Sequence, residues 1–546
     1  MTGAELLVKA LVKEGVEYVY GYPGVAICPF FDSLMSTEIH PILVREEQNA
    51  AHAASGYARI TGKVGVCSVT SGPGATNLIT GIATAFADSI PLVAITGQVD
   101  SRLLGSDVFQ EADISGACES FVKFSYIVRK ASDIPRIVKE AFFIASTGRK
   151  GPVLIDIPID VQNQNISRVS WPEEVSLRTY KPTVRGNGLQ IVRLMERLEK
   201  AKRPILCIGG GVHLAGAAQA VRIFAENNRI PTVCTMMGLG VMPTSHWMFF
   251  GMVGNNGQEY SNRAMNEADM VIMVGARVAD RSVRPEIISE DKVLVHIDVD
   301  PAEIGKNAGP SIPLVGDLKS VFDALNEREP VTADHSEWIQ TLTGYHREGR
   351  SLDVSKLAGG VKARDCDSVT PSAFVRALSL EMKENAVYVA DVGQNQLWSC
   401  QNYVAREGRF LTSGGMGTMG YSIPAAIGAK MADPHRQVVA VCGDGAFQMS
   451  MMELATIRQY RVPVKICVMR NQVLGLVRQY QHFIYKDRFA MTTMDDTPNL
   501  EKLAEAYGIR YVRLERNEDI PKKIREFLNE EDTALLECIV DPNEVV

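Results

Sequence analysis

The chain has 546 residues, 46% of them hydrophobic and 22% charged, which is the composition of an ordinary globular protein and predicts about three domains. Its net charge is −7 and we find no run of five or more Lys or Arg, so we expect no nucleic-acid binding. No uninterrupted apolar segment is long enough to span a membrane and the first residues lack a signal-peptide pattern, so we expect no membrane association.

The first part of the chain alternates buried strands with glycine-containing loops and helices. A helix is predicted over residues 3–14, and an alanine-rich helix follows Glu47-Gln48-Asn49 and continues to Tyr57. Apolar runs bounded by Gly or Pro predict strands at residues 18–22, 42–45, 64–69, 91–97 and 152–158. This repeated order of strand, glycine-rich loop and helix predicts a doubly wound parallel sheet, an α/β fold.

A polar stretch with Trp171-Pro172 and Lys181-Pro182 is typical of a linker, and a second unit follows it. A helix is expected over residues 189–201, and strands are expected at residues 204–208, 231–234, 270–274 and 293–298. The loops after these strands contain several glycines together with Arg277 and Arg281, and such a sheet edge could hold a large dinucleotide. Gly209-Gly-Gly alone is weak evidence, because tight turns after strands are common.

Residues 330–368 are polar and contain Gly349, Gly359 and Gly360, which predicts a second, longer crossover. A third unit begins near Thr370. Its first strand, residues 386–390, runs into Asp391-Val-Gly-Gln-Asn, and the loop Ser413-Gly-Gly-Met-Gly-Thr-Met-Gly precedes an alanine-rich helix. Three doubly wound parallel-sheet domains are therefore expected, with boundaries at residues 1–165, 185–330 and 368–546.

Residues 438–475 are the stretch on which the functional prediction depends. An apolar run, residues 438–442, ends at Gly443-Asp444-Gly445 and predicts a buried parallel strand. A helix that opens near Phe447 and a second strand over residues 463–469 then lead to Asn471. Because neighbouring parallel strands end at the same sheet edge, where α/β folds bind ligands, we expect Asp444 and Asn471 to lie close together.

These residue types predict a site for a divalent cation and a diphosphate. A carboxylate, an amide oxygen and a nearby main-chain carbonyl suit Mg²⁺, which completes its shell with water and phosphate oxygens. The flanking glycines allow close approach of the backbone, and the start of a helix attracts anions. An Asp-Gly pair is most often only a turn, but the strand, helix, strand and Asn in this order favour a binding site.

The cysteines and histidines indicate neither a metal centre nor disulfides. Ten cysteines occur without a CxxC pair, and several lie inside apolar strand runs, where free Cys behaves as a small hydrophobic residue. The nine histidines are scattered without the spacing of metal ligands. Reduced thiols in the cytoplasm are the simplest interpretation.

Motifs along nearly the whole chain resemble the catalytic large subunit of acetolactate synthase (acetohydroxyacid synthase), a thiamine-diphosphate (ThDP) enzyme. The Gly-Asp-Gly and the following Asn are similar to the metal and diphosphate motif of ThDP enzymes, although Arg470 stands where a first Asn is usual. The other motifs that carry the resemblance are Gly21-Tyr-Pro-Gly, Arg45-Glu-Glu-Gln-Asn, Thr70-Ser-Gly-Pro-Gly-Ala-Thr-Asn-Leu, Phe109-Gln-Glu, Gly275-Ala-Arg-Val-Ala-Asp-Arg, His296-Ile-Asp-Val-Asp-Pro and Ser413-Gly-Gly-Met-Gly-Thr-Met-Gly.

The resemblance implies a fold, cofactors and partners. The three domains would bind the pyrimidine of ThDP, FAD and the diphosphate in that order, with Mg²⁺ as the metal. The implied activity decarboxylates pyruvate and joins the two-carbon unit to a second 2-keto acid in branched-chain amino-acid biosynthesis. The implied assembly is a homodimer or a dimer of dimers, in which ThDP lies between chains, and a regulatory small subunit is a further partner to test.

The resemblance also implies roles for individual residues. Glu47 matches the glutamate that hydrogen-bonds the aminopyrimidine and so helps to activate the thiazolium; otherwise it would be a simple helix-capping residue. Met419 matches the apolar support that bends ThDP, and Arg281 matches the arginine that holds the carboxylate of the second keto acid. The remaining implied positions are Phe109 and Gln110 beside the reacting carbon; Gly393, Gln394, Gly417, Gly445, Ala446 and Gly475 for ThDP; Asp444, Asn471 and Val473 for the metal; and Arg149, Gly210, Gly211, Arg277 and Asp298 for FAD.

The walls of the implied substrate pocket depart from the family pattern. Val25 stands where a Gly is usual, and Tyr480 replaces the Trp that narrows the acceptor pocket. Further departures are Asn255-Asn256 for a Met-His pair, Ile159 for a Lys and Glu119 for an Arg, whereas Lys123 is retained. We expect no counterpart after Val546 of the family's C-terminal extension.

These departures leave three functions open. The leading hypothesis is the acetolactate-forming carboligase. The first alternative is another ThDP-dependent 2-keto acid decarboxylase or carboligase with a changed acceptor. The second is a catalytically silent ThDP- or FAD-binding regulatory protein, and the joint presence of Glu47, Asp444 and Asn471 argues against it.

Overall fold

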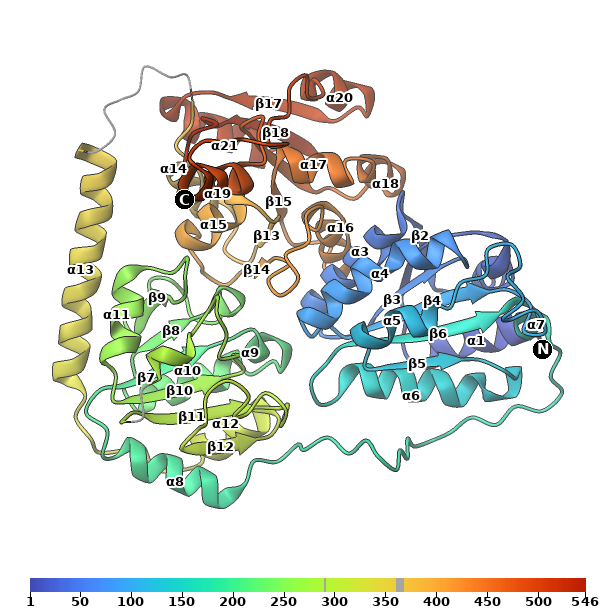
Figure 1. The fold of residues 1–546 in the computed structure, drawn as a ribbon, viewed down its shortest axis with the longest axis horizontal. Helices are drawn as coiled ribbons and strands as arrows, with labels where there is room; N and C mark the ends of the chain where they lie inside the picture. The colour runs from blue at the N-terminus through green and yellow to red at the C-terminus, as the bar shows by residue number, and fades with distance from the viewer. Residues whose placement is uncertain (289–290, 360–367) are drawn as a thin grey trace.

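The computed structural model describes residues 1–288, 291–359 and 368–546. The described chain contains three six-stranded sheets, and all strand pairs within them are parallel. Figure 1 shows the three sheets as separate α/β units, coloured blue to cyan, green and orange to red. The predicted fold class, three doubly wound parallel sheets, is confirmed.

The first unit has the strand order β2-β1-β3-β4-β6-β5. Its strands are β1 (Tyr18–Tyr22), β2 (His40–Leu43), β3 (Gly65–Val69), β4 (Leu92–Gln98), β5 (Phe124–Ile127) and β6 (Pro152–Pro158). Its helices are α1 (Gly3–Lys13), α2 (Cys28–Leu34), α3 (Glu47–Thr61), α4 (Pro73–Ala87), α5 (Ile114–Cys118), α6 (Ile134–Ser146) and α7 (Ile159–Asn163). The four central strands are buried along almost their whole length, which explains their continuous apolar sequences.

The second unit has the order β12-β11-β10-β7-β8-β9. Its strands are β7 (Pro204–Ile208), β8 (Thr232–Cys234), β9 (Phe249–Met252), β10 (Met270–Val274), β11 (Val293–Asp298) and β12 (Ile312–Val315). Its helices are α8 (Gly188–Leu198), α9 (Gly211–Leu214), α10 (Ala218–Asn227), α11 (Glu259–Glu267) and α12 (Leu318–Asn326). A long helix, α13 (Ser336–Gly359), packs against α11 and leads toward the third unit.

The third unit has the order β14-β13-β15-β16-β18-β17. Its strands are β13 (Val387–Ala390), β14 (Arg409–Leu411), β15 (Val438–Gly443), β16 (Lys465–Arg470), β17 (Arg510–Leu514) and β18 (Ala534–Ile539). Its helices are α14 (Pro371–Glu381), α15 (Gln394–Asn402), α16 (Ser422–Ala432), α17 (Asp444–Ser450), α18 (Glu453–Tyr460), α19 (Gly475–Tyr485), α20 (Leu500–Ala506) and α21 (Ile520–Leu528). The order places β15 between β13 and β16. The candidate site described below lies at the edge of the sheet where these strands end.

The structure differs from the sequence prediction at edges and crossovers. The prediction missed the edge strands β5, β9, β12, β14 and β17, which are short or partly exposed and so lack a long apolar run. Residues 336–359 form α13 rather than an irregular crossover, and residues 360–367 of that prediction lie outside the described residues. The helix expected to open near Phe447 begins at Asp444, so that prediction was wrong by one turn.

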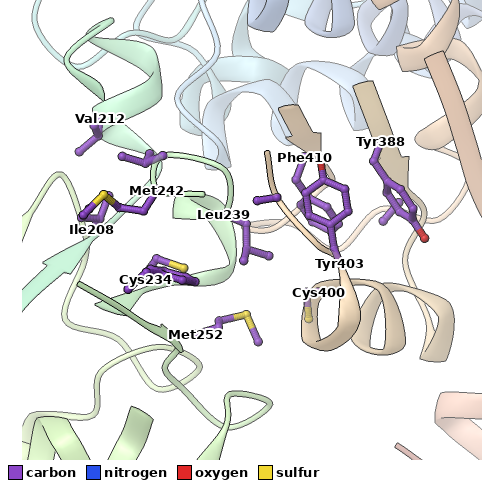
Figure 2. Close-up of a cluster of buried hydrophobic side chains, with 14 of the residues drawn as sticks. Ile208, Val212, Cys234, Leu239, Met242, Met252, Tyr388, Cys400, Tyr403 and Phe410 are labelled. Atoms are coloured by element: carbon purple, nitrogen blue, oxygen red, sulfur yellow. The ribbon is translucent and has the colours of Figure 1, made fainter. Parts of the chain in front are cut away.

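An apolar core joins the second and third units. Figure 2 shows Ile208, Cys234 and Met252 of the second unit facing Tyr403 and Phe410 of the third. These side chains belong to one continuous cluster of buried residues. Burial of these side chains holds the sheets of the second and third units in a fixed relation. Part of the same cluster lines one wall of the cavity described below.

Helix α3 of the first unit packs closely against α16 of the third. The hydroxyl oxygens of Ser55 and Tyr421 lie 3.1 Å apart at the start of α16. Further along, Gly428 lies so close to the main chain of Ala53 that an added Cβ would overlap it. None of the helices in the described ranges combines the length and apolar character that a membrane span requires.

Candidate functional site

The ends of β15 and β16 form one polar edge. The Asp444 carboxylate accepts hydrogen bonds from the main-chain N–H groups of Gln472, at 2.7 Å, and Gly445, at 3.1 Å. Asn471 follows β16, and its side-chain oxygen accepts a hydrogen bond from the N–H of Val473 at 3.2 Å. The structure thus brings together all three of the predicted metal-binding residues.

The chemistry of this donor set fits Mg²⁺. Asp444 is 4% exposed, and burial raises the pKa of its carboxyl to about 6, although hydrogen bonds from Gln472 and Gly445 act in the opposite direction. A divalent cation would stabilise the charged form of this carboxylate. Within the described ranges no group of three or more His, Cys, Asp or Glu could hold a metal, so a cation here needs amide, carbonyl and phosphate oxygens as well.

Gln394 lies beside Asn471 and closes one side of this edge. Its side-chain oxygen lies 3.4 Å from the Asn471 amide nitrogen, and its amide nitrogen donates to Gln479 Oε1 at 2.9 Å. An added Cβ on Gly475 would overlap the Gln394 oxygen. A side chain at this position would therefore displace the Gln394 amide, and Gly475 brings the start of α19 against this edge. Gly393, directly before Gln394, has a φ of +129°.

The other predicted ThDP-binding residues surround the same edge. Met419 lies near Gly445, because a Cβ on Gly445 would approach the Met419 methyl carbon at 3.4 Å. Ala446 is buried in the first turn of α17. Gly417 has a φ of +70° and open space at its Cβ position. These residues form an apolar and glycine-lined surface next to Asp444, as a cofactor that approaches the backbone needs.

Glu47 lies at a second polar cluster in the first unit. Its carboxylate accepts a hydrogen bond of 3.0 Å from the side-chain amide of Asn77 on α4. A Cβ on Gly74 would lie 3.4 Å from the other carboxylate oxygen. Sequence reasoning missed Asn77 as a partner of Glu47, although Asn77 lies in one of the motifs that carry the resemblance. A Thr-Asn pair in the first turns of a helix after Gly-Pro-Gly was the available signal.

Gln110, Phe109 and Val25 lie on the same side of the first unit as this cluster. Gln110 packs on Gly72, where an added Cβ would lie 2.9 Å from Gln110 Cα, and both residues have positive φ angles. Val25 is 76% exposed and Phe109 is 87% exposed. Exposed apolar side chains beside a polar cluster that is itself partly exposed indicate an interaction or ligand-binding face.

The contacts of Glu47 and the contacts next to Asp444 lie at different ends of α4. Gly74, beside Glu47, and Thr84 are separated by ten residues of α4, about 15 Å along a helix. The Thr84 hydroxyl contacts that of Thr418 at 2.7 Å, and Thr418 adjoins the Met419 that lies beside Gly445. Within the chain, α4 therefore separates the Glu47 cluster from the metal edge.

A cavity of about 750 Å³ lies between the three units. This volume lies within the range of small-molecule and cofactor sites. Its walls include all five residues predicted to contact FAD, which are Arg149, Gly210, Gly211, Arg277 and Asp298. Its lining also includes Gly417 and Leu476, which lie two residues before Met419 and one residue after Gly475. A cofactor in the cavity would thus lie close to the proposed ThDP site.

The cavity is lined both by charged side chains and by glycines that leave the main chain accessible. Arg149 donates to Glu303 at 2.8 Å and to the hydroxyl of Ser89 at 3.0 Å, so its guanidinium is held at the wall. Burial raises the pKa of Asp298 to about 6. Gly210 and Gly211 begin a helix beside the end of β7, where main-chain N–H groups and an arginine can bind a dinucleotide.

The residues predicted to line the substrate pocket lie in different surroundings. Arg281 lines the cavity, and its main-chain oxygen accepts a hydrogen bond from Asn255 N–H at 3.2 Å. Tyr480 on α19 is 58% exposed. Lys123 instead donates to the main-chain oxygens of Ile144 and Thr147 and to the Tyr180 hydroxyl, and burial lowers its pKa to about 8. Its hydrogen bonds join parts of the first unit to the segment after it.

Three regions of the chain match models of thiamine pyrophosphate enzymes. Residues 1–117 match the N-terminal TPP binding domain, residues 191–325 the central domain and residues 391–538 the C-terminal TPP binding domain. The acetolactate synthase large subunit of Lactococcus lactis is 40% identical over 100% of this chain and 93% of its own length. That of Haemophilus influenzae is 42% identical over 100% of this chain and 96% of its own. The isozyme 3 large subunit of Escherichia coli is 39% identical over 97% and 92%.

Proposed function

Because the chain belongs to the acetolactate synthase family of thiamine-diphosphate enzymes, we propose that it decarboxylates pyruvate and joins the two-carbon unit to a second 2-keto acid. The products are CO₂ and acetolactate from two pyruvates, or acetohydroxybutyrate when 2-ketobutyrate is the acceptor, in branched-chain amino-acid biosynthesis. The observation that carries the proposal is the edge where Asp444, Asn471 and Gln394 meet beside Met419.

ThDP, when bound, supplies the electron sink that makes decarboxylation of a 2-keto acid possible. Asp444 and Asn471, with the main-chain carbonyl of Val473, would hold Mg²⁺ and through it the diphosphate. Gly393, Gln394, Gly417, Gly445, Ala446 and Gly475 would form the surface against which ThDP lies. Glu47 would hold a proton at the aminopyrimidine ring and so support proton removal at thiazolium C2.

FAD is proposed as a further cofactor, bound in the cavity between the units. The volume of about 750 Å³ and the five lining residues Arg149, Gly210, Gly211, Arg277 and Asp298 support this assignment. Arginines recognise phosphate through paired N–H groups, and glycines at the ends of parallel strands admit a dinucleotide. The proposed conversion of two 2-keto acids into CO₂ and one larger product involves no net oxidation or reduction, so FAD would serve as a structural component.

The acceptor keto acid is proposed to lie between Arg281, Gln110 and the apolar surface of Val25, Phe109 and Tyr480. Arg281 provides a planar guanidinium for a carboxylate. Val25 and Tyr480 change the size of this pocket relative to the family pattern, which favours a second candidate: a ThDP enzyme that releases acetaldehyde or uses another acceptor. Asn255 would support the Arg281 loop, and Lys123 contributes to stability more than to substrate contact.

The assembly is proposed to be a homodimer or dimer of dimers in which each ThDP lies between Glu47 of one chain and Asp444 of another. The separation of these residues by α4 within one chain supports this arrangement. The relatives' name, large subunit, supports a regulatory small subunit as a further partner. Nine described cysteines without disulfides support a cytoplasmic location. Residues 1–165, 185–330 and 368–546 would bind the pyrimidine, FAD and the diphosphate.

A product assay tests the proposed function. The protein is incubated with ThDP, Mg²⁺ and FAD, and with pyruvate alone or with 2-ketobutyrate. Acetolactate and acetohydroxybutyrate as main products support the carboligase. Acetaldehyde as the main product supports the decarboxylase instead. Absence of CO₂ release, with ThDP shown to be bound, would contradict both and favour a silent binding protein.

A further inference from the structure

One face of α18 holds the segment that leads into Glu47. The Tyr460 hydroxyl accepts a hydrogen bond from the N–H of Leu43 at 2.9 Å, and Thr456 Oγ1 lies 3.1 Å from the Leu43 carbonyl oxygen. Glu453, Thr456 and Tyr460 are spaced by three and four residues, so they lie on one face of the helix. Figure 1 shows α18 of the third unit beside β2 of the first.

Glu453 makes the central contacts of this face. Its side chain belongs to a fully buried residue, and Oε1 accepts hydrogen bonds from Arg45 N–H at 2.8 Å and from the Asn49 side-chain amide at 3.0 Å. Arg45 and Asn49 lie two positions before and two positions after Glu47. One buried carboxyl group therefore joins both sides of the first turn of α3, from which the Glu47 side chain projects.

The contacts at Glu453 Oε2 agree with a protonated carboxyl group, and the Leu43 carbonyl oxygen has a second donor in the Arg45 guanidinium at 3.1 Å. Its Oε2 lies 2.6 Å from Thr456 Oγ1, which also lies 3.1 Å from the Leu43 carbonyl. A threonine hydroxyl carries one hydrogen and cannot donate to both oxygens. If Glu453 is protonated, it donates to Thr456, and Thr456 donates to Leu43. Burial raises the pKa of Glu453 in agreement, although hydrogen bonds from Thr456, Arg45 and Asn49 and the positive charge of Arg45 act in the opposite direction.

We propose that Glu453 is a positioning residue for the reaction: a neutral carboxylic acid that fixes the first turn of α3 and, through it, the orientation of Glu47. The proposal rests on the proposed function, because it assigns Glu47 the proton at the aminopyrimidine. A displacement of about 1 Å at a reacting group can lower a rate by roughly 100-fold. Loss of these contacts should therefore reduce catalysis while the Glu47 residue itself is unchanged.

Three variants and a control separate this role from the alternatives. Glu453→Gln keeps an oxygen for Arg45 and Asn49 and an N–H for Thr456, so it mimics a neutral acid. Glu453→Ala removes all contacts of the carboxyl group, and Thr456→Val removes only the hydroxyl relay, which keeps the test valid if the alanine variant does not fold. The control is Gln459→Ala, on the same helix, where Gln459 Oε1 accepts from the Arg45 guanidinium.

The first measurement is backbone amide hydrogen exchange over residues 43–50 in the protein without cofactors. We expect Glu453→Ala and Thr456→Val to exchange faster by roughly 10-fold, and Glu453→Gln and Gln459→Ala to match the wild type. Unchanged exchange in both Glu453→Ala and Thr456→Val would overturn the positioning role. Fast exchange in Glu453→Gln would overturn the neutral state, because an ionised Glu453 is not mimicked by glutamine.

The second measurement uses the protein loaded with ThDP, Mg²⁺ and FAD. The rate of deuterium exchange at thiazolium C2 and the kcat with pyruvate should fall roughly 10- to 100-fold in Thr456→Val and Glu453→Ala, with unchanged pyruvate KM. Glu453→Gln should retain both rates. If the wild type does not accelerate C2 exchange over free ThDP, the proposed function fails. If the wild type does and the variants equal it, the inference about Glu453 fails.

Discussion

The carboxylate of Asp444 accepts a 2.7 Å hydrogen bond from the main-chain N–H of Gln472, so the first residue after β15 is tied to the loop after β16. This contact fixes the distance between the two strand ends at which the proposed metal ligands lie. It is formed by the protein alone, and the cation edge is therefore preorganised. The predictions below concern this edge, the cavity beside it and the face that a second chain would cover.

Gly475→Ala should weaken binding of ThDP and Mg²⁺ together. The new Cβ would overlap the side-chain oxygen of Gln394, which must move away from the edge or displace α19. We expect roughly a 10-fold or greater loss of ThDP affinity, equivalent to about 1.4 kcal/mol or more. Calorimetric titration of the protein with ThDP at a fixed Mg²⁺ concentration measures this affinity. The control is Gly188→Ala, where the Cβ meets open space; an equal loss there would contradict the account.

Arg277→Ala should weaken FAD binding and leave ThDP binding unchanged. Arg277 lines the cavity beside the end of β10, where the proposed dinucleotide phosphates lie. Loss of one arginine contact to a phosphate should lower FAD affinity by roughly 10-fold. The measurement is a titration of the apo-protein with FAD, followed by flavin absorbance after gel filtration. An unchanged FAD affinity would place the flavin elsewhere or exclude it.

Tyr480→Trp should increase the preference for 2-ketobutyrate over pyruvate as acceptor. The family's tryptophan forms a narrow apolar pocket, and one methylene in such a pocket is worth about 1 to 3 kcal/mol. The wild type should show weak preference, and the variant should raise it roughly 10-fold or more. The ratio of the two products formed from a mixture of both acceptors measures this preference. Phe483→Trp, on the same exposed helix, serves as the control. A strong preference in the wild type would contradict this prediction.

Lys123→Met should change stability and its pH dependence more than acceptor choice. Burial lowers the pKa of Lys123 to about 8 in the folded chain, whereas a lysine ordinarily titrates near 10.5. Between these values the unfolded chain binds a proton that the folded chain has released, so the Lys123 contribution to the free energy of unfolding rises with pH. The wild type should therefore gain Tm relative to Lys123→Met from pH 8 to about pH 10. Exposed Lys9→Met is the control, and a difference that stays constant with pH would refute the prediction.

The sequence predicts the closeness of Asp444 and Asn471 because its signals are local. A buried apolar run that ends in Gly443-Asp444-Gly445 and a following strand before Asn471 place both residues at one sheet edge through the parallel topology alone. The same pattern of apolar runs predicts most of the central strands of the three sheets. It does not give the edge strands such as β5, since their half-exposed residues lack a continuous apolar pattern.

Contacts between segments that are far apart in the chain cannot be predicted from the local sequence pattern. Asn49 and Glu453 are 404 residues apart, and nothing in their own segments predicts their hydrogen bond. Lys123 was expected in the substrate pocket from the resemblance, whereas its ammonium group ends among main-chain oxygens that only the folded chain brings together. Asn77 could be predicted only as part of a motif, because its partner Glu47 lies on another helix.

The most direct test of the account is subunit complementation between Glu47→Gln and Asp444→Ala. Each variant alone should lose most turnover: Glu47→Gln by roughly 10²- to 10⁴-fold, through loss of an acid–base group, and Asp444→Ala through loss of Mg²⁺ and ThDP. A mixed dimer contains one site with both the intact Glu47 and the intact Asp444. Equal mixing with free subunit exchange should therefore restore about a quarter of wild-type activity. If mass spectrometry shows mixed dimers and no activity returns, the shared ThDP site is contradicted.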